Sequence, residues 1–294
     1  MTPIELFLKP KFIRKILKHL VRTKPFRILN DRAYVSLDYI VNMGRKPNIT
    51  SPETYNEKLI HSMLYDRRTE YKNLVDKIEV RNFVLSRIGE QYLIPVLGVF
   101  NEPEDIDFNS LPAQFVLKIS SASGMSVICR DKKELNRRKV VSILQKWMKN
   151  DYYWKHREWA YKGLIPRIIC EKYMVDESGY DLKDYKFFCF NGEVRMLMVA
   201  ADRGDELKRN FYDVEFNSLK IMENEFSSKI CKPINYEKMV DIAEKLASDL
   251  PHVRVDLYNV KGKIYFGEMT LYHKSGHEHW KPKEYDKILG KWFI

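Results

Sequence analysis

The sequence predicts an α+β fold in which the sheets are antiparallel. Amphipathic helical segments alternate with pairs of strands, and Asn191-Gly192 separates two strand-like runs, which is typical of a two-residue hairpin turn. The chain contains neither GxGxxG nor GxxxxGK[ST], so no Rossmann unit or P-loop is indicated. Its 294 residues, of which 45% are hydrophobic, suffice for one large or two moderate domains.

The first ninety residues are predicted to be mainly helical. Residues 51–68 form one predicted helix, with Ser51 as its cap and Pro52 at its first position. Residues 71–90 form a second helix that ends at Gly89. Its inward side chains are predicted to be Leu74, Ile78, Leu85 and Ile88. On the first helix four polar residues form either a surface face or part of an acceptor site: Asn56, Glu57, Lys58 and His61.

The remaining elements alternate between strands and helices. Residues 114–131 form a strand, a loop of small residues and a second strand, and residues 133–149 form a helix. The other predicted elements are a strand within 164–174, a hairpin over 184–202, a helix over 235–250 and a final strand pair over 253–270.

The positive charge of the chain is concentrated at its N-terminus. The net charge is +11, and residues 1–28 carry eight Lys or Arg side chains against one acid. Apolar residues within 10–24 follow helical spacing with cations between them. Two interpretations remain open, a helix on an anionic membrane surface and a helix that caps the domain. We expect no nucleic-acid partner, because no nucleic-acid-binding motif is present.

The sequence predicts a reducing, cytoplasmic location, with an inner membrane face as an option. No apolar run approaches the roughly 18 residues of a membrane helix, and we read no signal peptide at the start. The cysteines are scattered and form no CxxC motif, which favours reduced core thiols. They are Cys129, Cys170, Cys189 and Cys231.

The last strand pair carries an unusual group of charges. In "HVRVDLYNV", Arg254 and Asp256 alternate with apolar residues, and "GKIYFGEMT" places Glu268 in the facing strand. The two carboxylates share a face only if the numbers of paired residues have an even sum, for example 256 with 268, which predicts a three-residue loop over 261–263. Facing carboxylates repel unless a metal ion or a cation offsets them. The alternative is a surface hairpin whose acids are balanced by neighbouring lysines.

Several segments, in order, resemble the ATP-grasp superfamily of carboxylate–amine ligases. They are similar in particular to the teichuronopeptide-biosynthesis (TupA-like) ATP-grasp family, which is associated with surface polysaccharide synthesis. The segments are "VDKIEVR", "FVLKISSASG", "CEKYM", "DYKFFCFNGE" and "RVD…GEMT". The resemblance implies two α+β subdomains with antiparallel sheets that clamp ATP. We divide the chain into 1–28 (basic helix), 29–110 (helical region), 111–172 (N-subdomain) and 173–294 (C-subdomain).

The resemblance also implies roles for individual residues. Metal ligands would be Asp256, Glu268 and Thr270, and Arg254 and Lys186 would be the catalytic cations. Nucleotide contacts would come from Lys77, Lys118, Ser120, Ser121, Ser123, Gly124, Glu171, Lys172, Met174 and Asp184. Two positions depart from the pattern, since Thr270 stands where the superfamily usually has Asn, and Ser121 where the closer family often has His.

The implied activity is amide formation through an acyl phosphate, with ATP and two Mg²⁺ ions as cofactors. The carboxylate and the amine would belong to a small molecule or lipid-linked glycan, such as a uronic acid or amino sugar, and to an amino acid. The alternatives are a glycosyltransferase, for which the chain offers only the DxD of Asp105–Asp107, and a non-catalytic assembly subunit. The cluster of His273, His277, Glu278 and His279 is open to three interpretations: a metal site, a substrate contact or a structural loop.

Overall fold

The computed structural model describes residues 11–179, 182–202, 207–221 and 230–294. The chain forms two compact units, each assembled from separate stretches of sequence. Unit 1 is made of Met1–Thr69, Tyr152–Lys162 and Tyr272–Ile294, and unit 2 of Glu70–Asp151 and Gly163–Leu271. The four predicted segments are consecutive, whereas these units are interleaved along the chain. No helix in the described ranges has the length and apolarity needed to cross a lipid bilayer.

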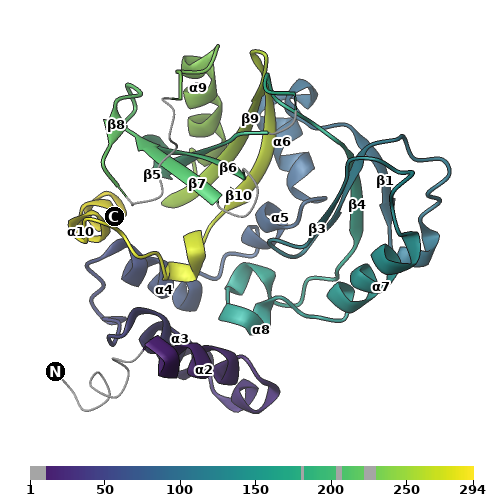
Figure 1. Cartoon of the computed structure of the whole chain (residues 1–294). Coiled ribbons are helices and arrows are strands. Elements are labelled where there is room, and N and C mark those ends of the chain that lie inside the picture. The colour runs from purple at the N-terminus through teal and green to yellow at the C-terminus, as the bar shows by residue number, and fades with distance from the viewer. Residues whose placement is uncertain (1–10, 180–181, 203–206, 222–229) are drawn as a thin grey trace. The chain divides into compact units, whose positions relative to one another are not determined.

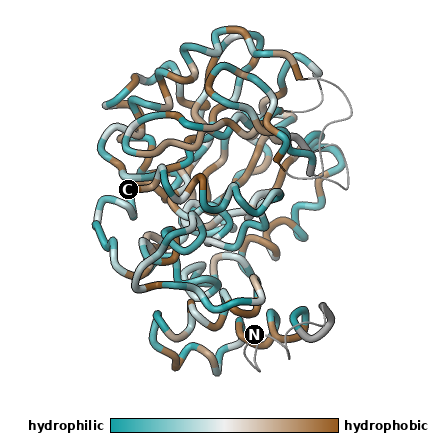
Figure 2. Tube along the Cα trace, turned by 90° about the vertical axis from the view of Figure 1, so that its left-hand side faces the viewer, coloured by the Kyte–Doolittle hydropathy of each residue, from teal (hydrophilic) through white to brown (hydrophobic). Residues whose placement is uncertain are grey.

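The secondary-structure elements in the described part of unit 1 are all helices (Figure 1). Its elements are α2 (Lys11–Val21), η1 (Lys24–Ile28), α3 (Asp31–Met43), α4 (Tyr55–Tyr65), α8 (Tyr153–His156), η4 (Trp159–Tyr161), η5 (His273–Gly276) and α10 (Glu284–Trp292). The predicted basic helix is present as α2, although the first ten residues of the basic segment lie outside the described residues. Hydrophilic and hydrophobic residues alternate along the chain trace (Figure 2), as amphipathic elements require.

Helix α4 begins later than predicted. Thr54, not Ser51, is its N-cap, and its hydroxyl accepts a hydrogen bond from the backbone N–H of Glu57 at 3.3 Å. The Glu57 carboxylate in turn accepts from the backbone N–H of Thr54, also at 3.3 Å. This reciprocal capping box satisfies two N–H groups that the helix leaves free, which the predicted Ser-Pro start could not do.

The surface interpretation of the polar face of α4 is wrong for two of its residues. Asn56 is fully buried, and its side-chain amide donates to the backbone carbonyl of Glu278 at 2.9 Å. Glu57 is 4% exposed and forms an ion pair with Arg45 at 2.5 Å. Lys58 donates to the backbone carbonyl of Phe293 at 2.5 Å. These groups therefore tie together distant stretches of unit 1.

Unit 2 contains both sheets, and all of their strand pairs are antiparallel, as predicted. The first sheet has the order β1-β4-β2-β3. Its strands are β1 (Val96–Phe100), β4 (Ile168–Lys172), β2 (Phe115–Ile119) and β3 (Ser126–Cys129), and α7 (Arg137–Met148) contacts β2. Strand β1 was not predicted from the sequence.

The second sheet has the order β10-β9-β5-β6-β7-β8. Its strands are β5 (Asp184–Phe190), β6 (Glu193–Asp202), β7 (Leu207–Tyr212), β8 (Ser218–Leu219), β9 (His252–Val260) and β10 (Lys263–Thr270). Helix α9 (Tyr236–Ala247) packs against β5, β6 and β9 (Figure 1). The Asn191-Gly192 turn is confirmed, with φ of 51° and 83°, as a two-residue turn with two left-handed residues requires.

The predicted helix over 71–90 is instead two helices, α5 (Tyr71–Val75) and α6 (Val80–Ile88). The break comes at Asp76, whose carboxylate accepts hydrogen bonds from the backbone N–H groups of Ile78 and Glu79. This local capping competes with continuous helical hydrogen bonding. The end at Gly89 is confirmed. Because the helix is broken, Val80 and Val84 are buried in place of Leu85, which is 50% exposed.

Candidate functional site

A β-bulge sets the geometry of the carboxylate hairpin. Strands β9 and β10 are joined by the two-residue turn Lys261-Gly262, so the predicted three-residue loop is wrong. The predicted pairing of Asp256 with Glu268 is nevertheless correct, because the register shifts between Phe266 and Glu268. The bulge lets one strand carry an extra residue, Gly267. A Cβ at Gly267 would lie 3.0 Å from the Asp256 carbonyl oxygen, so glycine permits this close approach.

The middle strands of the sheet hold a lysine between two carboxylates. In β5, Lys186 pairs directly with Asp256 of β9. The Nζ atom of Lys186 lies 2.5 Å from Oδ2 of Asp256 and 2.8 Å from Oδ2 of Asp184. Only 13% of the Lys186 side chain and 2% of the Asp256 side chain are exposed. Desolvation offsets much of the attraction in ion pairs this close to the protein interior, but leaving one of the charges unmatched there is costly.

The guanidinium of Arg254 completes the group. It donates from Nε to Oδ1 and from Nη2 to Oδ2 of Asp256, both at 2.7 Å. Its Nη2 atom also donates to the Thr270 hydroxyl at 2.9 Å. This bidentate geometry fixes the carboxylate plane. Arg254, Asp256, Glu268 and Thr270 therefore share one face of the sheet, as the strand pairing requires.

The charges in this group alter one another's proton affinity. Burial works to raise the pKa of Asp256, but Arg254 and Lys186 together lower it. Burial and the neighbouring Asp256 raise the pKa of Asp184, although Lys186 opposes this. Burial tends to lower the pKa of Lys186, but Asp184 and Asp256 raise it overall. Asp256 is thus held ionised, whereas Asp184 is the carboxylate that lacks full compensation.

A second group of charges lies between the two sheets within unit 2. The Nζ atom of Lys118, on β2, lies 2.6 Å from Oε2 of Glu171 on β4. Arg81 of α6 reaches the other oxygen of Glu171 at 3.6 Å. Lys77 lies 4.0 Å from Glu268 of the hairpin. Burial lowers the pKa of Lys77, and the nearby Glu268 carboxylate offsets part of this shift. Of the two lysines predicted to bind phosphate, Lys77 therefore lies near Glu268, a predicted metal ligand, and Lys118 near Glu171, the predicted adenine contact.

The loop between β2 and β3 is hydrogen-bonded to Lys77. Lys77 donates from its backbone N–H to the carbonyl of Ser120 at 3.0 Å, and from Nζ to the carbonyl of Ala122. The N–H of Ser120 is already donated to the Arg167 carbonyl at 2.8 Å, and its hydroxyl to Asp76. Because the N–H of Ser120 is used in this way, only the N–H groups of residues 121–124 in this loop are candidates to donate to a phosphate. Of these, Ser123 and Gly124 are exposed and Ser121 is buried.

The segment predicted to read the adenine ring continues from β4. Glu171 is 8% exposed. Lys172 is exposed, and its backbone N–H is donated to the Pro95 carbonyl at 3.0 Å. Met174 lies just beyond the strand and is partly exposed. In this segment, the main-chain groups after Lys172 are therefore the candidates for hydrogen bonds to an adenine ring.

These residues fit a nucleotide-bound magnesium ion. Mg²⁺ takes oxygen ligands from one or two carboxylates together with phosphate oxygens. The Oδ1 atom of Asp184 is buried and has no hydrogen-bond partner among the described residues, a condition that costs free energy and that a cation would relieve. Glu268, with 27% of its side chain exposed, is the other accessible carboxylate. Both oxygens of Asp256 already accept hydrogen bonds from Arg254 and Lys186.

The space for a nucleotide is closed by ion pairs. The cavity lined by Lys77, Arg81, Lys118, Glu171 and Glu268, together with apolar neighbours, has a volume of about 10 Å³. That volume holds about one water molecule. Separation of the Lys118–Glu171 contact would enlarge this cavity and free both groups for a ligand.

Two contributors to this site were missed from the sequence. Arg81 stands four residues after Lys77, a helical spacing that could have pointed to it. Asp76 precedes Lys77, and its carboxylate binds the Ser120 hydroxyl at 2.9 Å, so it positions the loop that follows β2. The Asp-Lys dipeptide was noticed for its lysine alone.

Other predicted candidates are used structurally. Asp105 caps the backbone N–H of Glu102, and Asp107 accepts from the N–H of Asn109 at 2.9 Å, so the DxD segment is a turn. His273 is fully buried against Glu278 at 3.1 Å. His279 is partly buried, and burial lowers its pKa. His277 lies apart from these two, beside Asp38 at 3.9 Å.

Residues 57–294 match the sequence model of a protein family described as TupA-like ATPgrasp. No curated protein matches the chain.

Similar solved structures are ligases or synthetases by their descriptions. The D-alanine–D-alanine ligase from Bacillus anthracis complexed with ATP is 16% identical, with a TM-score of 0.38 over 67% of this chain and 53% of that one. The ATP-grasp ligase PsnB complexed with a minimal precursor is 11% identical, with a TM-score of 0.41 over 86% and 67%. The D-cycloserine synthetase DcsG is 14% identical, with a TM-score of 0.39 over 75% and 73%. The chain spans about half the length of the D-alanine–D-alanine ligase.

Proposed function

The chain belongs to the TupA-like ATP-grasp family, and from that premise we propose that it is an ATP-dependent carboxylate–amine ligase. One observation carries the proposal. The face of β5, β9 and β10 gathers carboxylates and buried cations around Oδ1 of Asp184, which has no hydrogen-bond partner in the described part of the chain. The Lys77 ammonium lies 4.0 Å from Glu268. Such a group suits a polyphosphate with its metal ions.

In this proposal the residues act mainly by positioning and by charge. Lys77 and Lys118 would hold phosphate oxygens, and the N–H groups of residues 121–124 would add donors. Asp256, Glu268, Thr270 and the unpartnered oxygen of Asp184 would hold two magnesium ions. When bound, these ions would offset the negative charge that opposes attack by a carboxylate on a phosphate. Positioning and charge are the main requirements of phosphoryl transfer.

Arg254 and Lys186 would act on the reacting group. The substrate carboxylate would attack the γ-phosphorus atom, which releases ADP and leaves an acyl phosphate. An amine would then attack the acyl carbon, lose a proton and expel inorganic phosphate, so that an amide remains. Arg254 and Lys186 would stabilise the oxyanion of the tetrahedral intermediate, because both are buried cations whose pKa values are raised by carboxylates.

We infer the substrate class from the family. A uronic acid or amino sugar of a surface polysaccharide would be joined to an amino acid or another amine, in the cytoplasm where ATP is supplied. Membrane contact through α2 would bring the enzyme to a lipid-linked glycan. Ile16 and Leu20, one turn apart, are 52% and 48% exposed, which supports this contact.

The glycosyltransferase alternative depended on the DxD motif of Asp105–Asp107. Both of these carboxylates accept hydrogen bonds from backbone N–H groups of a turn, so the motif no longer supports it. The non-catalytic alternative rests on Ser121, which stands where the closer family often has histidine. Turnover distinguishes it from the ligase.

Hydroxylamine tests the ligase reaction directly, because it attacks an acyl phosphate and leaves a hydroxamate. We expect ATP- and Mg²⁺-dependent hydroxamate when the protein is given uronic acids and their nucleotide-linked forms. The Arg254→Met variant should form at least about a hundredfold less, the scale of losing one oxyanion donor. The Arg195→Met variant, which removes a half-exposed arginine from β6, should match the wild type. Hydroxamate formation without ATP, or equal rates in both variants, would contradict the proposal.

A further inference from the structure

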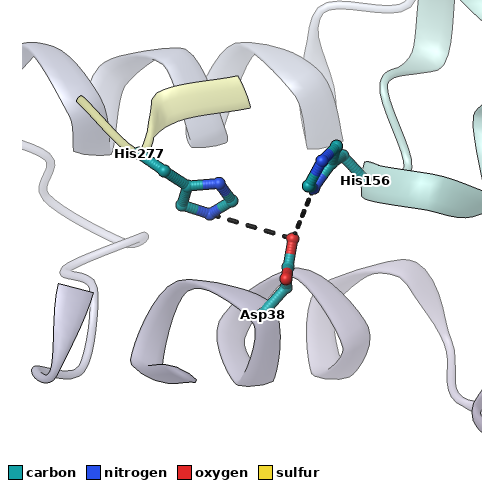
Figure 3. A group of neighbouring side chains, drawn as sticks. All are labelled: Asp38, His156 and His277. Carbon is teal, nitrogen blue, oxygen red and sulfur yellow. Dashed lines mark hydrogen bonds and ion pairs between the residues drawn. The ribbon is translucent and has the colours of Figure 1, made fainter. Parts of the chain in front are cut away.

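Three segments of unit 1 that are distant in sequence bring two histidines and an aspartate together (Figure 3). Asp38 lies on α3, His156 is the last residue of α8, and His277 directly follows η5. One ligand atom from each residue lies within 4.8 Å of the others. This group lies outside the charges assigned to the nucleotide, all of which belong to unit 2.

The contacts of Asp38 leave one position incomplete. Its Oδ1 atom accepts a hydrogen bond from the side-chain amide of Asn42 at 2.8 Å. Its Oδ2 atom lies 2.7 Å from Nδ1 of His156 and 3.9 Å from Nε2 of His277. The Nε2 atom of His277 is buried and has no hydrogen-bond partner among the described residues. A buried polar atom without a partner is uncommon in a folded protein and points to an unmade contact.

We propose that Asp38, His156 and His277 form a binding site for a divalent transition-metal ion, with Zn²⁺ as the best match. Zinc bonds to imidazole nitrogen and carboxylate oxygen are about 2.0–2.2 Å long, which places tetrahedral ligand atoms about 3.3–3.5 Å apart. The observed separations of 2.7 and 3.9 Å lie on either side of this spacing. These two separations would need to change by about 0.4–0.8 Å to reach the zinc spacing. The ion would replace the proton between His156 and Asp38.

The ligand types favour zinc over magnesium. Two imidazoles and one carboxylate suit Zn²⁺ and its neighbours in the first transition row, whereas Mg²⁺ prefers oxygen ligands alone. The hydrogen bond from the Asn42 side-chain amide to Oδ1 of Asp38 would orient this carboxylate toward the ion. Three protein ligands leave a fourth position for water or a substrate oxygen. By joining α3, α8 and the segment after η5, the ion would fasten the stretches that make up unit 1.

Equilibrium dialysis of the chelator-treated full chain against ZnCl₂, in excess Mg²⁺, tests the site. We expect one Zn²⁺ per chain, and at least about a tenfold loss of affinity in His277→Gln and Asp38→Asn, the lower bound for disturbing a metal site. His279→Gln is the matched control, since it removes a histidine two residues away. Glu268→Gln and Cys231→Ser test the nucleotide site and the exposed thiol. All three controls should bind Zn²⁺ like the wild type.

His277→Gln is the decisive variant because Nε2 of His277 has no hydrogen-bond partner among the described residues. Losing the ring contacts with Tyr39 and His156 should lower the melting temperature of the metal-free protein by no more than a few degrees. X-ray absorption at the zinc edge of the wild type gives an independent result that requires no variant, with two imidazole ligands expected. The proposal is overturned if the wild type takes up no Zn²⁺, if its affinity is unchanged in His277→Gln, or if the absorption spectrum contains no imidazole ligands.

Discussion

Lys186→Met tests the central ion group of the sheet. The substitution keeps an unbranched side chain that is one atom shorter, and it removes the charge that lies 2.8 Å from Asp184 and 2.5 Å from Asp256. Removing one partner of a buried ion pair costs about 3–5 kcal/mol, because the remaining charge is left unmatched. Asp256 keeps its bidentate contact with Arg254, so most of the unmatched charge falls on Asp184. We expect a loss of about 3–5 kcal/mol in the free energy of unfolding at pH 7.

The pH dependence identifies the responsible carboxylate. The pKa of Asp184 is already raised, and without Lys186 it would rise further. A carboxyl whose pKa is higher in the folded state than in the unfolded state holds more protons when folded, so stability increases as the pH falls. Between that raised pKa and about 3.9, the variant should therefore regain up to about 1.4 kcal/mol per pH unit. The lowered pKa of Asp256 in the wild type gives the opposite slope, with stability lost as the pH falls below about 3.8.

Urea unfolding at pH 7 measures the stability that Lys186→Met loses, and unfolding at pH 5 measures how much of it the variant regains. The matched control is the double variant Lys186→Met with Asp184→Asn, which removes the unmatched charge and should recover part of the loss. The reasoning is refuted if Lys186→Met costs less than about 1 kcal/mol at pH 7, the scale of an exposed pair. It is also refuted if the double variant is no more stable than the single one.

Two further predictions concern the bulge and the basic helix. Gly267→Ala would press a Cβ against the Asp256 carbonyl and the Tyr258 ring, both at 3.0 Å, so we expect a loss of about 1–3 kcal/mol in urea unfolding together with weaker Mg·ATP binding; an unchanged protein would mean that the bulge does not need glycine. Replacing Ile16 and Leu20 by Ser should reduce binding to anionic vesicles at least about tenfold while leaving the melting temperature unchanged, since both side chains are half exposed; equal binding by the variant would remove the membrane role of α2.

Local patterns in the sequence predicted most elements of unit 2 correctly. The Asn191-Gly192 turn, the strands on either side of the small-residue loop and the apolar face of α9 all depend on neighbours within a few residues. The register of Asp256 against Glu268 was also predicted, although for the wrong loop length. Alternation along a strand cannot reveal a bulge, because the extra residue is detected only against its partner strand.

The errors have a common physical origin in contacts between distant residues. The burial of Asn56 depends on Glu278, more than two hundred residues away, and no helical periodicity records such a partner. The break before α6 comes from the side chain of Asp76 bonding to nearby N–H groups, a competition that propensity does not decide. The group of Asp38, His156 and His277 comes from three separate segments, so only His277 drew notice in the sequence.

The binding of Mg·ATP by the site on β9 and β10 is the central claim, and a thermal-shift titration tests it most directly. A ligand at a hundred times its Kd adds about 2.7 kcal/mol to stability, which for a chain of this size raises Tm by several degrees. We predict this rise for the wild type and for Glu193→Gln, a control that changes an exposed carboxylate on β6, and its loss in Glu268→Gln. A rise with UDP-sugars alone, or an undiminished rise with Mg·ATP in Glu268→Gln, would contradict the account.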